Sequence, residues 1–552
     1  MWLKWTLLLF FIYLVHCDDG LCGLEPPKEG ESCSGSTEDT EENGKDTVLK
    51  YEYEEKPMTA EEEDIWAKRF YTKMRYTNKV DWPIREELDH AENYFANDLD
   101  KAVELFEDLQ KKHPNSPRAL YVGTRARLSR LFNSTLKRDT EEYNKELNAI
   151  LDVYSAMLDR YVEDSEKEPE DMDIMPVLFS SIVVHSTSIA DAHNLTERSV
   201  ALTKKAMDKS PGYQNEERYH LAIIHGHILL GQWELAEKAT DLALELKENS
   251  FNLQMLKGLL MKTMGRKKEG NRLLRSLDSD RVERISTCHD TNNFAQALFN
   301  FGKYDFARML IQESSKHHIF LSHYQRPVLT IEKDNMENEV VWDHENHVGL
   351  STYDEEFEAL KEVIPVIKAE ALKAVENEAE QQRFYVRFYE NANGNIFESR
   401  SEGGNLTVLP LFVYGKRERM NCMELMPQTC KFLKANFTRP TQFKLGVIKL
   451  NAIDAKTKTL PLDSLTNANL RLILPLQVPQ GFEYRVGKDT ILDLKEDQIM
   501  VIDQSYEHSY NNQKGSQKAV WLSIDLIHPD LTEQDLKQVQ ASDYAKQLFL
   551  QF

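Results

Sequence analysis

A histidine at the end of a strand-like segment is the residue of this chain best placed to do chemistry. His508 closes the stretch Val501-Ile-Asp-Gln-Ser-Tyr-Glu-His508, and a second strand-like segment at 520–527 closes on His528-Pro529. A neutral imidazole carries a lone pair that binds transition metals. The pattern predicts a strand that delivers His508 to a pocket, although a single histidine at a strand end can equally be an ordinary hydrogen-bonded residue. His528 is interpreted as structural, fixing the turn after the last strand.

The segments around these histidines are predicted to be strands. From about residue 401 the sequence changes to short apolar runs separated by turn residues, a pattern typical of strands. The runs are 406–414, 442–450, 470–478, 482–486, 498–502 and 520–527. Because no helical pattern separates them, we predict an antiparallel sandwich or barrel for residues 401–552.

The region 63–320 has helical periodicity and an internal repeat. Gly231-Gln-Trp-Glu-Leu-Ala236 is followed 34 residues later (231 to 265) by Gly265-Arg-Lys-Lys-Glu-Gly270, and Gly302-Lys-Tyr-Asp-Phe-Ala307 gives a further copy. This period is typical of tetratricopeptide repeats, so we predict an α-solenoid, with a plain helical bundle as the alternative. Solenoids present concave surfaces, which favours protein or peptide partners.

Residues 321–400 are predicted to connect the solenoid to the strand-rich domain. A helix is expected over about 353–382, where apolar residues recur at helical spacing. Pro365 lies inside this helix and is expected to kink or split it.

The N-terminal residues predict a secreted or endoplasmic-reticulum luminal protein. Residues 1–17 have the pattern of a cleaved signal peptide, which we favour over a membrane anchor because the apolar run is short. Residues 18–62 are rich in Glu and Asp and are predicted to be a disordered acidic linker, acting as a spacer or as a calcium-buffering or client-attracting segment. Four Asn-x-Ser/Thr sequons agree with a luminal route: Asn133, Asn194, Asn405 and Asn436.

Composition excludes several classes of function. The 552-residue chain has a net charge of -23, so we expect no nucleic-acid partner, because phosphates would be repelled. We find no segment long enough to span a membrane, no Gly-rich phosphate loop, no Gly-x-Ser-x-Gly elbow and no His-Glu-x-x-His motif. The cysteines are too sparse for a disulfide-built fold, but Cys422 with Cys430, and Cys22 with Cys33, have the spacing to close short loops.

Several motifs between 411 and 532 resemble one enzyme family. They are Gly415-Lys-Arg-Glu-Arg-Met-Asn-Cys422, Pro427-Gln-Thr-Cys430, Thr466-Asn467, Leu470-Arg471-Leu472 and Ser505-Tyr-Glu-His508. In order and spacing they resemble the aspartyl/asparaginyl β-hydroxylases, and the likeness extends over about 63–552. The resemblance implies an α+β multidomain protein in which a TPR-like α-solenoid precedes a double-stranded β-helix (jelly-roll) oxygenase domain. Cys422 and Cys430 correspond to the family's closely spaced cysteine pair.

The resemblance also implies where a metal would bind. The family holds Fe(II) with two histidines, and His508 matches the second of them. The position of the first histidine is occupied by Leu462, whose side chain has no lone pair. A one-residue slip would bring Asp463 to the metal, so that Asp463 and His508 would form an oxygen–nitrogen pair.

The 2-oxoglutarate site implied by the resemblance is altered too. Arg471 matches a basic residue that lines this site, and a family histidine two positions further on is Ile473 here. The arginine that clamps the far carboxylate of 2-oxoglutarate falls on Lys518 or Ala519, depending on where a one-residue insertion is placed. Lys518 lacks the planar fork of arginine.

We therefore predict a pseudoenzyme that binds EGF-like or similar client polypeptides. The alternative is an active peptidyl-Asp/Asn β-hydroxylase that uses Fe(II) through His508 and Asp463 and 2-oxoglutarate through Arg471 and Lys518. A third possibility is that the remodelled pocket takes a different metal or cosubstrate.

Overall fold

The computed structural model describes residues 78–541 apart from 96–97, 135–139, 164–172, 175, 194, 279–281, 332, 334–335, 337–338, 344–345, 377–402, 418–420 and 463–464. The predicted signal peptide (1–17), the acidic linker (18–62), Cys22, Cys33, Asn194 and Asp463 lie outside the described residues. Two compact units are distinguished. One reaches to Ser188 and includes Lys205–Pro211, and the other comprises Ile189–Lys204 and Gly212–Phe552. The five-segment division made from the sequence stays a prediction.

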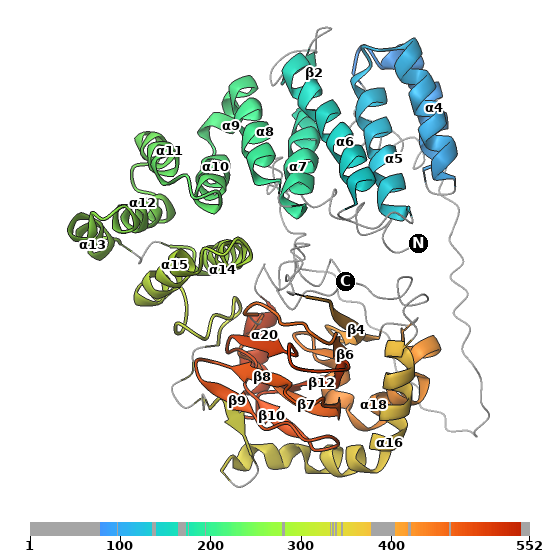
Figure 1. The fold of residues 1–552 in the computed structure, drawn as a ribbon, viewed down its shortest axis with the longest axis vertical. Helices are drawn as coiled ribbons and strands as arrows, with labels where there is room; N and C mark the ends of the chain where they lie inside the picture. The colour runs from blue at the N-terminus through green and yellow to red at the C-terminus, as the bar shows by residue number, and fades with distance from the viewer. Residues whose placement is uncertain are drawn as a thin grey trace, which may run out of the picture. The chain divides into compact units, whose positions relative to one another are not determined.

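The first part of the chain is helical (Figure 1). A short 3-10 turn, η1 (Trp82–Ile84), precedes the helices, and β1 (Val162–Glu163) and β2 (Asp173–Ile174) form a small parallel pair. The helices are α3 (Arg85–Asn93), α4 (Leu99–Lys112), α5 (Pro117–Asn133), α6 (Glu141–Arg160), α7 (Pro176–Ala192), α8 (Thr196–Lys209), α9 (Pro211–Asn215), α10 (Glu217–Leu229), α11 (Trp233–Leu246), α12 (Phe251–Thr263), α13 (Lys267–Arg275), α14 (Arg284–Asn300) and α15 (Tyr304–Lys316).

The repeated glycines lie in the turns between paired helices. Gly231 separates α10 from α11, Gly265 separates α12 from α13, and Gly302 separates α14 from α15. Their φ angles are 74°, 89° and 68°, in the left-handed region where a residue without Cβ is favoured. The sequence repeat therefore marks successive helical hairpins, as predicted.

Close helix crossing in the α12–α13 pair depends on two further glycines. A Cβ at Gly270 would lie 2.5 Å from the carbonyl oxygen of Gly258, and Gly258 itself faces Leu274. Gly270 occupies the repeat position that is Ala236 in the preceding hairpin, and Ala236 is fully buried. Small residues at this position let the two backbones approach each other.

The second part of the chain is built on two antiparallel sheets. The seven-stranded sheet has the order β3-β10-β7-β12-β6-β4-β5, and the three-stranded sheet has the order β11-β8-β9. The strands are β3 (Val341–Trp342), β4 (Leu406–Val413), β5 (Lys416–Arg417), β6 (Val447–Ile453), β7 (Asn469–Gln477), β8 (Glu483–Val486), β9 (Thr490–Leu492), β10 (Met500–Ile502), β11 (His508–Asn511) and β12 (Ala519–Ile527). The remaining elements are η2 (Val348–Tyr353), α16 (Asp354–Glu376), a π-helical turn η3 (Asn421–Leu425), α18 (Pro427–Asn436), α19 (Thr438–Gln442) and α20 (Glu533–Gln540).

The large sheet buries both of its faces. Leu470, Leu472 and Leu474 of β7 pack in a cluster with residues of α16 and α18, which lie beside the sheet in Figure 1. Ile473 of β7 and Trp521 of β12 point to the opposite face, because successive side chains alternate along a strand. There they pack with side chains of the small sheet. The α+β class, with helices first and an antiparallel domain after them, is confirmed, whereas the double-stranded β-helix arrangement stays a prediction.

Three local predictions differ from the structure. Helix α16 continues through Pro365 and is not split there. Residue 442 belongs to α19, and the strand expected at 442–450 begins at Val447. Residues 501–508 do not form one strand: β10 ends at Ile502, and β11 begins at His508.

None of the helices in the described part of the chain is long and apolar enough to cross a membrane.

We expect Gly270→Ala to destabilise the α12–α13 hairpin by about 1–3 kcal/mol, because the added methyl group would meet backbone rather than a flexible side chain. Lys268→Ala, at an exposed position of the same helix, is the matched control and is expected to stay within about 0.5 kcal/mol of wild type. Urea unfolding followed by circular dichroism measures both. Equal midpoints for Gly270→Ala and wild type would contradict the close crossing.

Candidate functional site

His508 lies at the start of β11 and is held by main-chain hydrogen bonds on two sides. It pairs with Val486 of β8, and it forms an isolated antiparallel bridge with Leu462. In this bridge the Leu462 amide donates to the His508 carbonyl at 2.7 Å, and the His508 amide donates to the Leu462 carbonyl at 3.0 Å. Directly opposed residues of an antiparallel pair project their side chains to the same face. The first and second histidine positions implied by the family therefore lie side by side.

The imidazole of His508 is buried, with 2% of the residue exposed. Its Nδ1 lies 3.1 Å from the carbonyl oxygen of Tyr506. Because a carbonyl oxygen only accepts, Nδ1 donates this hydrogen bond, and the lone pair of the neutral ring lies on Nε2. With Nδ1 used as a donor, a metal would bind this histidine through Nε2.

Leu462 is also 2% exposed and belongs to an apolar cluster between the two sheets. The cluster combines side chains of both sheets: Ile453, Leu462, Ile473, Tyr484, Val486, Leu492, Ile502, Tyr510, Ala519 and Trp521. It contains three positions at which the resemblance implies metal or cosubstrate residues, namely Leu462, Ile473 and Ala519. Asp463, the alternative ligand, lies outside the described residues.

The two predicted cosubstrate cations are paired with carboxylates. Arg471 Nε donates to Asp525 Oδ1 at 2.9 Å, and both side chains are almost completely buried. Lys518 Nζ lies 3.2 Å from Asp454 Oδ1, with about a quarter of each side chain exposed. The side chain of Ala519 packs in the apolar cluster. Residue 519, and not residue 518, therefore faces the inside of the domain.

A carboxylate next to His508 connects the site to the last helical hairpin. Arg308 of α15 makes two hydrogen bonds to Glu507, at 2.8 and 3.0 Å, and Arg326 makes another at 2.8 Å. Burial would raise the pKa of Glu507, but the charges of Arg326 and Arg308 outweigh it and hold this pKa below its ordinary value. Arg326 is fully buried and Arg308 is 38% exposed.

The loop before Glu507 contains a second buried carboxylate. Asp503 Oδ1 accepts from the Ser505 amide at 2.8 Å, and its Oδ2 accepts from the side-chain amide of Gln325 at 3.3 Å. Burial raises the pKa of Asp503 to about 6, and the hydrogen bonds with Ser505 oppose this shift. The Gln325 side chain also donates to the Ser505 hydroxyl at 2.8 Å, so this loop is fixed to the segment after α15.

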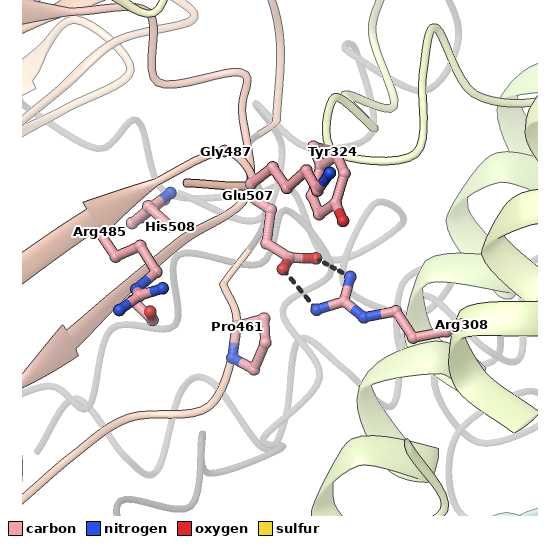
Figure 2. A pocket seen from close by; sticks show the side chains of 9 residues that line it. Arg308, Tyr324, Pro461, Arg485, Gly487, Glu507 and His508 are labelled. Carbon is pink, nitrogen blue, oxygen red and sulfur yellow. Dashed lines mark hydrogen bonds and ion pairs between the residues drawn. The ribbon is translucent and has the colours of Figure 1, made fainter. Parts of the chain in front are cut away.

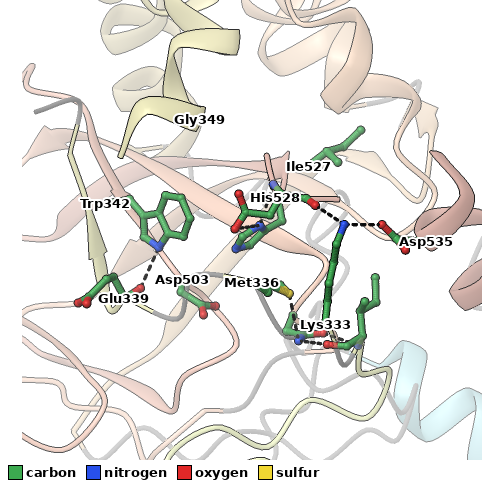
Figure 3. A network of polar contacts seen from close by, with 12 residues as sticks. Lys333, Met336, Glu339, Trp342, Gly349, Asp503, Ile527, His528 and Asp535 are labelled. Atoms are coloured by element: carbon green, nitrogen blue, oxygen red, sulfur yellow. Dashed lines mark hydrogen bonds and ion pairs between the residues drawn. The ribbon is translucent and has the colours of Figure 1, made fainter. Parts of the chain in front are cut away.

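The segment after α15 also contacts the loop that carries Leu462. The Asn467 side chain accepts from the Ile331 amide at 2.8 Å and donates to the Ile331 carbonyl at 2.9 Å. In Figure 3, Lys333 reaches the Asp530 carbonyl and the Asp535 carboxylate. The same residue stretch therefore holds both loops on which the predicted metal positions lie.

His528 has the structural role that the sequence predicts for it. It is fully buried, its Nδ1 accepts from the Asp530 amide at 3.3 Å, and the Trp342 ring packs edge-on at 4.9 Å. Its hydrogen bond with Asp530 places it at the turn that follows β12 (Figure 3).

A cavity of about 220 Å³ opens beside His508 and Glu507 (Figure 2). Its lining residues are Arg308, Tyr324, Pro461, Arg485, Gly487, Lys488, Glu507, His508 and Ser509. Figure 2 shows Arg308 and Arg485 on opposite sides of Glu507. The lining is thus cationic on both sides, in a chain whose net charge is -23.

Cys422, Cys430, Asn405 and Asn436 do not line this cavity, and Asn133 belongs to the other compact unit. Cys422 and Cys430 form a disulfide bond. Asn405 and Asn436 are exposed, and Asn133 is the last residue of α5. Among the residues that the structure describes, no group of three or more His, Cys, Asp or Glu side chains is placed to hold a metal ion.

Sequence reasoning missed the basic residues of the cavity. Arg308 and Arg326 lie 199 and 181 residues from Glu507 along the chain, and no local pattern marks them as its partners. Arg485 and Lys488 lie on β8 and the turn after it, close to Gly487, whose φ is 61°. A turn glycine between two strand-like runs does not by itself mark the cations beside it as site residues.

Comparisons with known proteins point to one family. The family model described as Aspartyl/Asparaginyl beta-hydroxylase matches residues 361–529. The aspartyl/asparaginyl beta-hydroxylases of Mus musculus and Homo sapiens are each 22% identical over 482 residues, which is 85% of this chain. The chain spans 58% of the mouse protein and 56% of the human protein, little more than half of their length.

Solved TPR proteins are similar to the helical part. A thermophilic TPR protein of Thermus thermophilus is 18% identical with a TM-score of 0.19, covering 39% of this chain and 98% of its own. YrrB, a TPR protein with an unusual peptide-binding site, is 12% identical with a TM-score of 0.21, covering 39% of this chain and 93% of its own.

Replacing Glu507 by Gln is expected to destabilise the fold by about 3 kcal/mol, because it leaves the fully buried Arg326 without its counter-charge. Arg308→Gln should cost less, about 1 kcal/mol, because Arg308 is partly exposed and Arg326 still neutralises Glu507. Thermal unfolding midpoints at pH 7 compare the two variants. The reverse order of stability would contradict the assignment of Arg326 as the main partner.

Asp503→Asn tests the raised pKa of that carboxyl. A folded-state pKa of about 6, above the ordinary 3.8, means that wild type gains stability as pH falls through 6. Between pH 7 and pH 5 we expect wild type to gain about 1 kcal/mol relative to Asp503→Asn. Asp493→Asn, at a side chain that is 84% exposed, is the control and should show no such difference. Parallel pH profiles of wild type and Asp503→Asn would refute the shift.

Proposed function

Because this chain belongs to the aspartyl/asparaginyl β-hydroxylase family, we propose that it binds client polypeptides and has lost the family's iron-dependent hydroxylation. The clients would be EGF-like or similar domains, and the place of action would be the endoplasmic-reticulum lumen or the secreted space. The class of client follows from the resemblance to the family, and the place of action follows from the signal-like N-terminal sequence.

The observation that carries this proposal is the pairing of Leu462 with His508. The two residues are main-chain hydrogen-bonded neighbours, and Leu462 is buried among apolar side chains of both sheets. A pair consisting of one imidazole and one hydrocarbon side chain does not supply the two nitrogen donors that the family uses for Fe(II). The residues at this pair therefore do not fit the metal, and we derive no reaction step through it.

The residues implied for 2-oxoglutarate support the same conclusion. The charge of Arg471 is balanced by Asp525 inside the domain, and the ammonium of Lys518 lies on Asp454. Trp521, one of the largest fully buried side chains, fills the apolar cluster together with Ile473 and Ala519. A dicarboxylate would have to displace these contacts.

Client binding is supported by the parts that remain. The helical hairpins give stacked surfaces of the kind that bind peptides in repeat proteins. The cationic cavity at Glu507 lies next to the last hairpin, to which Arg308 belongs.

The second candidate function is an active hydroxylase with a remodelled site. It is favoured by the tautomer of His508, which places a lone pair on Nε2. In this candidate Asp463 would supply the second donor to Fe(II), and Arg471 and Lys518 would bind 2-oxoglutarate.

Thermal unfolding under anaerobic conditions separates the two candidates. With Fe(II) or Mn(II), we expect wild type to show no additional stabilisation by 2-oxoglutarate. A ligand at 100 times its Kd would add about 2.7 kcal/mol if it bound the native state alone. A metal-dependent shift by 2-oxoglutarate that is abolished by His508→Ala would overturn the proposal and favour the active enzyme.

Leu462→His tests the same site by adding a second imidazole opposite His508. Because position 462 faces the same side as His508, we expect this variant to bind Mn(II) with at least about tenfold higher affinity than wild type. Leu492→His, which adds a histidine elsewhere in the same apolar cluster, is the control.

The client-binding proposal further predicts that His508→Ala still binds an EGF-like domain as wild type does. Isothermal titration calorimetry measures this binding, and its loss in the variant would count against the proposal.

A further inference from the structure

We propose that the cavity beside Glu507 is a binding site for a carboxylate- or sulfate-type anion, with Arg485 and Lys488 as the cations that hold it. The inference depends on the proposed function only for the source of the anion, which is either an acidic side chain of a client or a free small anion. The site itself is argued from its own charges.

The cavity has an excess of positive charge that its own residues do not cancel. Three cationic side chains line it, Arg308, Arg485 and Lys488, against the single carboxylate of Glu507. The charge of Glu507 is already balanced by the fully buried Arg326. An anion that enters the cavity therefore meets net positive charge at short range and in a partly enclosed setting, where charge-assisted hydrogen bonds are strong.

Arg485 and Lys488 are only weakly engaged by their neighbours. The guanidinium of Arg485 lies 3.9 Å from Glu483, and the ammonium of Lys488 lies 3.8 Å from Asp489. The Arg485 side chain is 45% exposed and that of Lys488 is 70% exposed. Exposed pairs at such distances contribute little, so both cations can turn to a ligand at small cost.

A main-chain hydrogen bond links the turn that carries these cations to Glu507. The amide of Gly487, between Arg485 and Lys488, donates to the Glu507 carbonyl at 2.7 Å. The neighbouring His508 is fixed in turn by its bridge to Leu462. Main-chain hydrogen bonds therefore connect the turn of Arg485 and Lys488 to Glu507, next to His508.

Arg308 can take part without leaving Glu507 unpaired. It is the exposed member of the two arginines on Glu507, and Arg326 keeps its hydrogen bond to the carboxylate if Arg308 moves. The cost of exchanging Arg308 from Glu507 to an entering anion is therefore small. Arg471 and Lys518 do not line this cavity, so the site is separate from the implied cosubstrate positions.

The size of the cavity restricts the ligand. About 220 Å³ is below the range of drug-sized ligand sites, roughly 300–1,000 Å³, and suits one acidic side chain or a small dianion. A cavity of this size admits a single acidic side chain of an extended polypeptide.

Isothermal titration calorimetry of the full chain with succinate, with sulfate, and with a short Asp-containing peptide and its Asn-containing twin tests the proposal. We expect the Asp peptide or the small dianions to bind, and Arg485→Gln and Lys488→Gln each to weaken binding about tenfold. The matched control is Lys495→Gln, which removes an exposed cation outside the cavity and should leave affinity unchanged.

The results identify the source of the anion as well as the site. Binding of the Asp peptide, but not of its Asn twin, with competition by succinate, assigns the site to an acidic client segment. Binding of the small dianions alone assigns it to a free anion. No binding by any of the probes, or equal weakening by Lys495→Gln, overturns the proposal. Neither of these results bears on whether Leu462 prevents iron binding, so the proposed function is tested separately.

Discussion

The structure around His508 depends on one buried ion pair, between Glu507 and Arg326. A carboxylate and a guanidinium withdrawn from water are stable only when they satisfy each other, and here the sequence neighbours of His508 are held to the segment after α15 by this pair. Arg308 adds a further contact from α15 itself. The helical hairpins and the sheets of this unit are therefore joined at the residue next to the predicted metal ligand, rather than by a passive linker.

In the proposed function, an apolar core stands where the family has its metal site. The backbone bridge between residues 462 and 508 does not depend on what their side chains are, because it consists of amide–carbonyl hydrogen bonds. A leucine at 462 fills its side of the pair with apolar contacts, and Trp521 adds bulk from β12. The charges of Arg471 and Asp525 remain, but they compensate each other inside the domain. In this proposal the backbone pairing of residues 462 and 508 is retained, while Leu462 supplies no donor for a metal.

Much of the fold could be read from local pattern. Gly231, Gly265 and Gly302 predicted the hairpin turns because a left-handed φ is a local requirement, and the apolar run 470–478 predicted the strand β7. Local pattern failed where tertiary contacts decide: α16 continues through Pro365, and the chain leaves β10 before it reaches His508. At the site, the sequence identified His508 and Leu462 but left Lys518 and Ala519 undecided, since only the packing of β12 shows which of them points inward. The partners of Glu507 could not be found, because they lie more than 180 residues away along the chain.

The edge of the large sheet has a consequence for dissecting this protein into parts. Strand β3, at Val341–Trp342, precedes α16 in the chain yet forms the outermost strand of the sheet, against Val501 and Ile502 of β10. A fragment that starts at residue 401 would lack this strand, and β10 would present unpaired amides and carbonyls to solvent. Such an edge is a template for pairing with another copy. Trp342, which is 3% exposed, would also be missing from the core beneath it. We therefore expect a fragment of the sheet domain to need the segment before α16 to keep this edge paired.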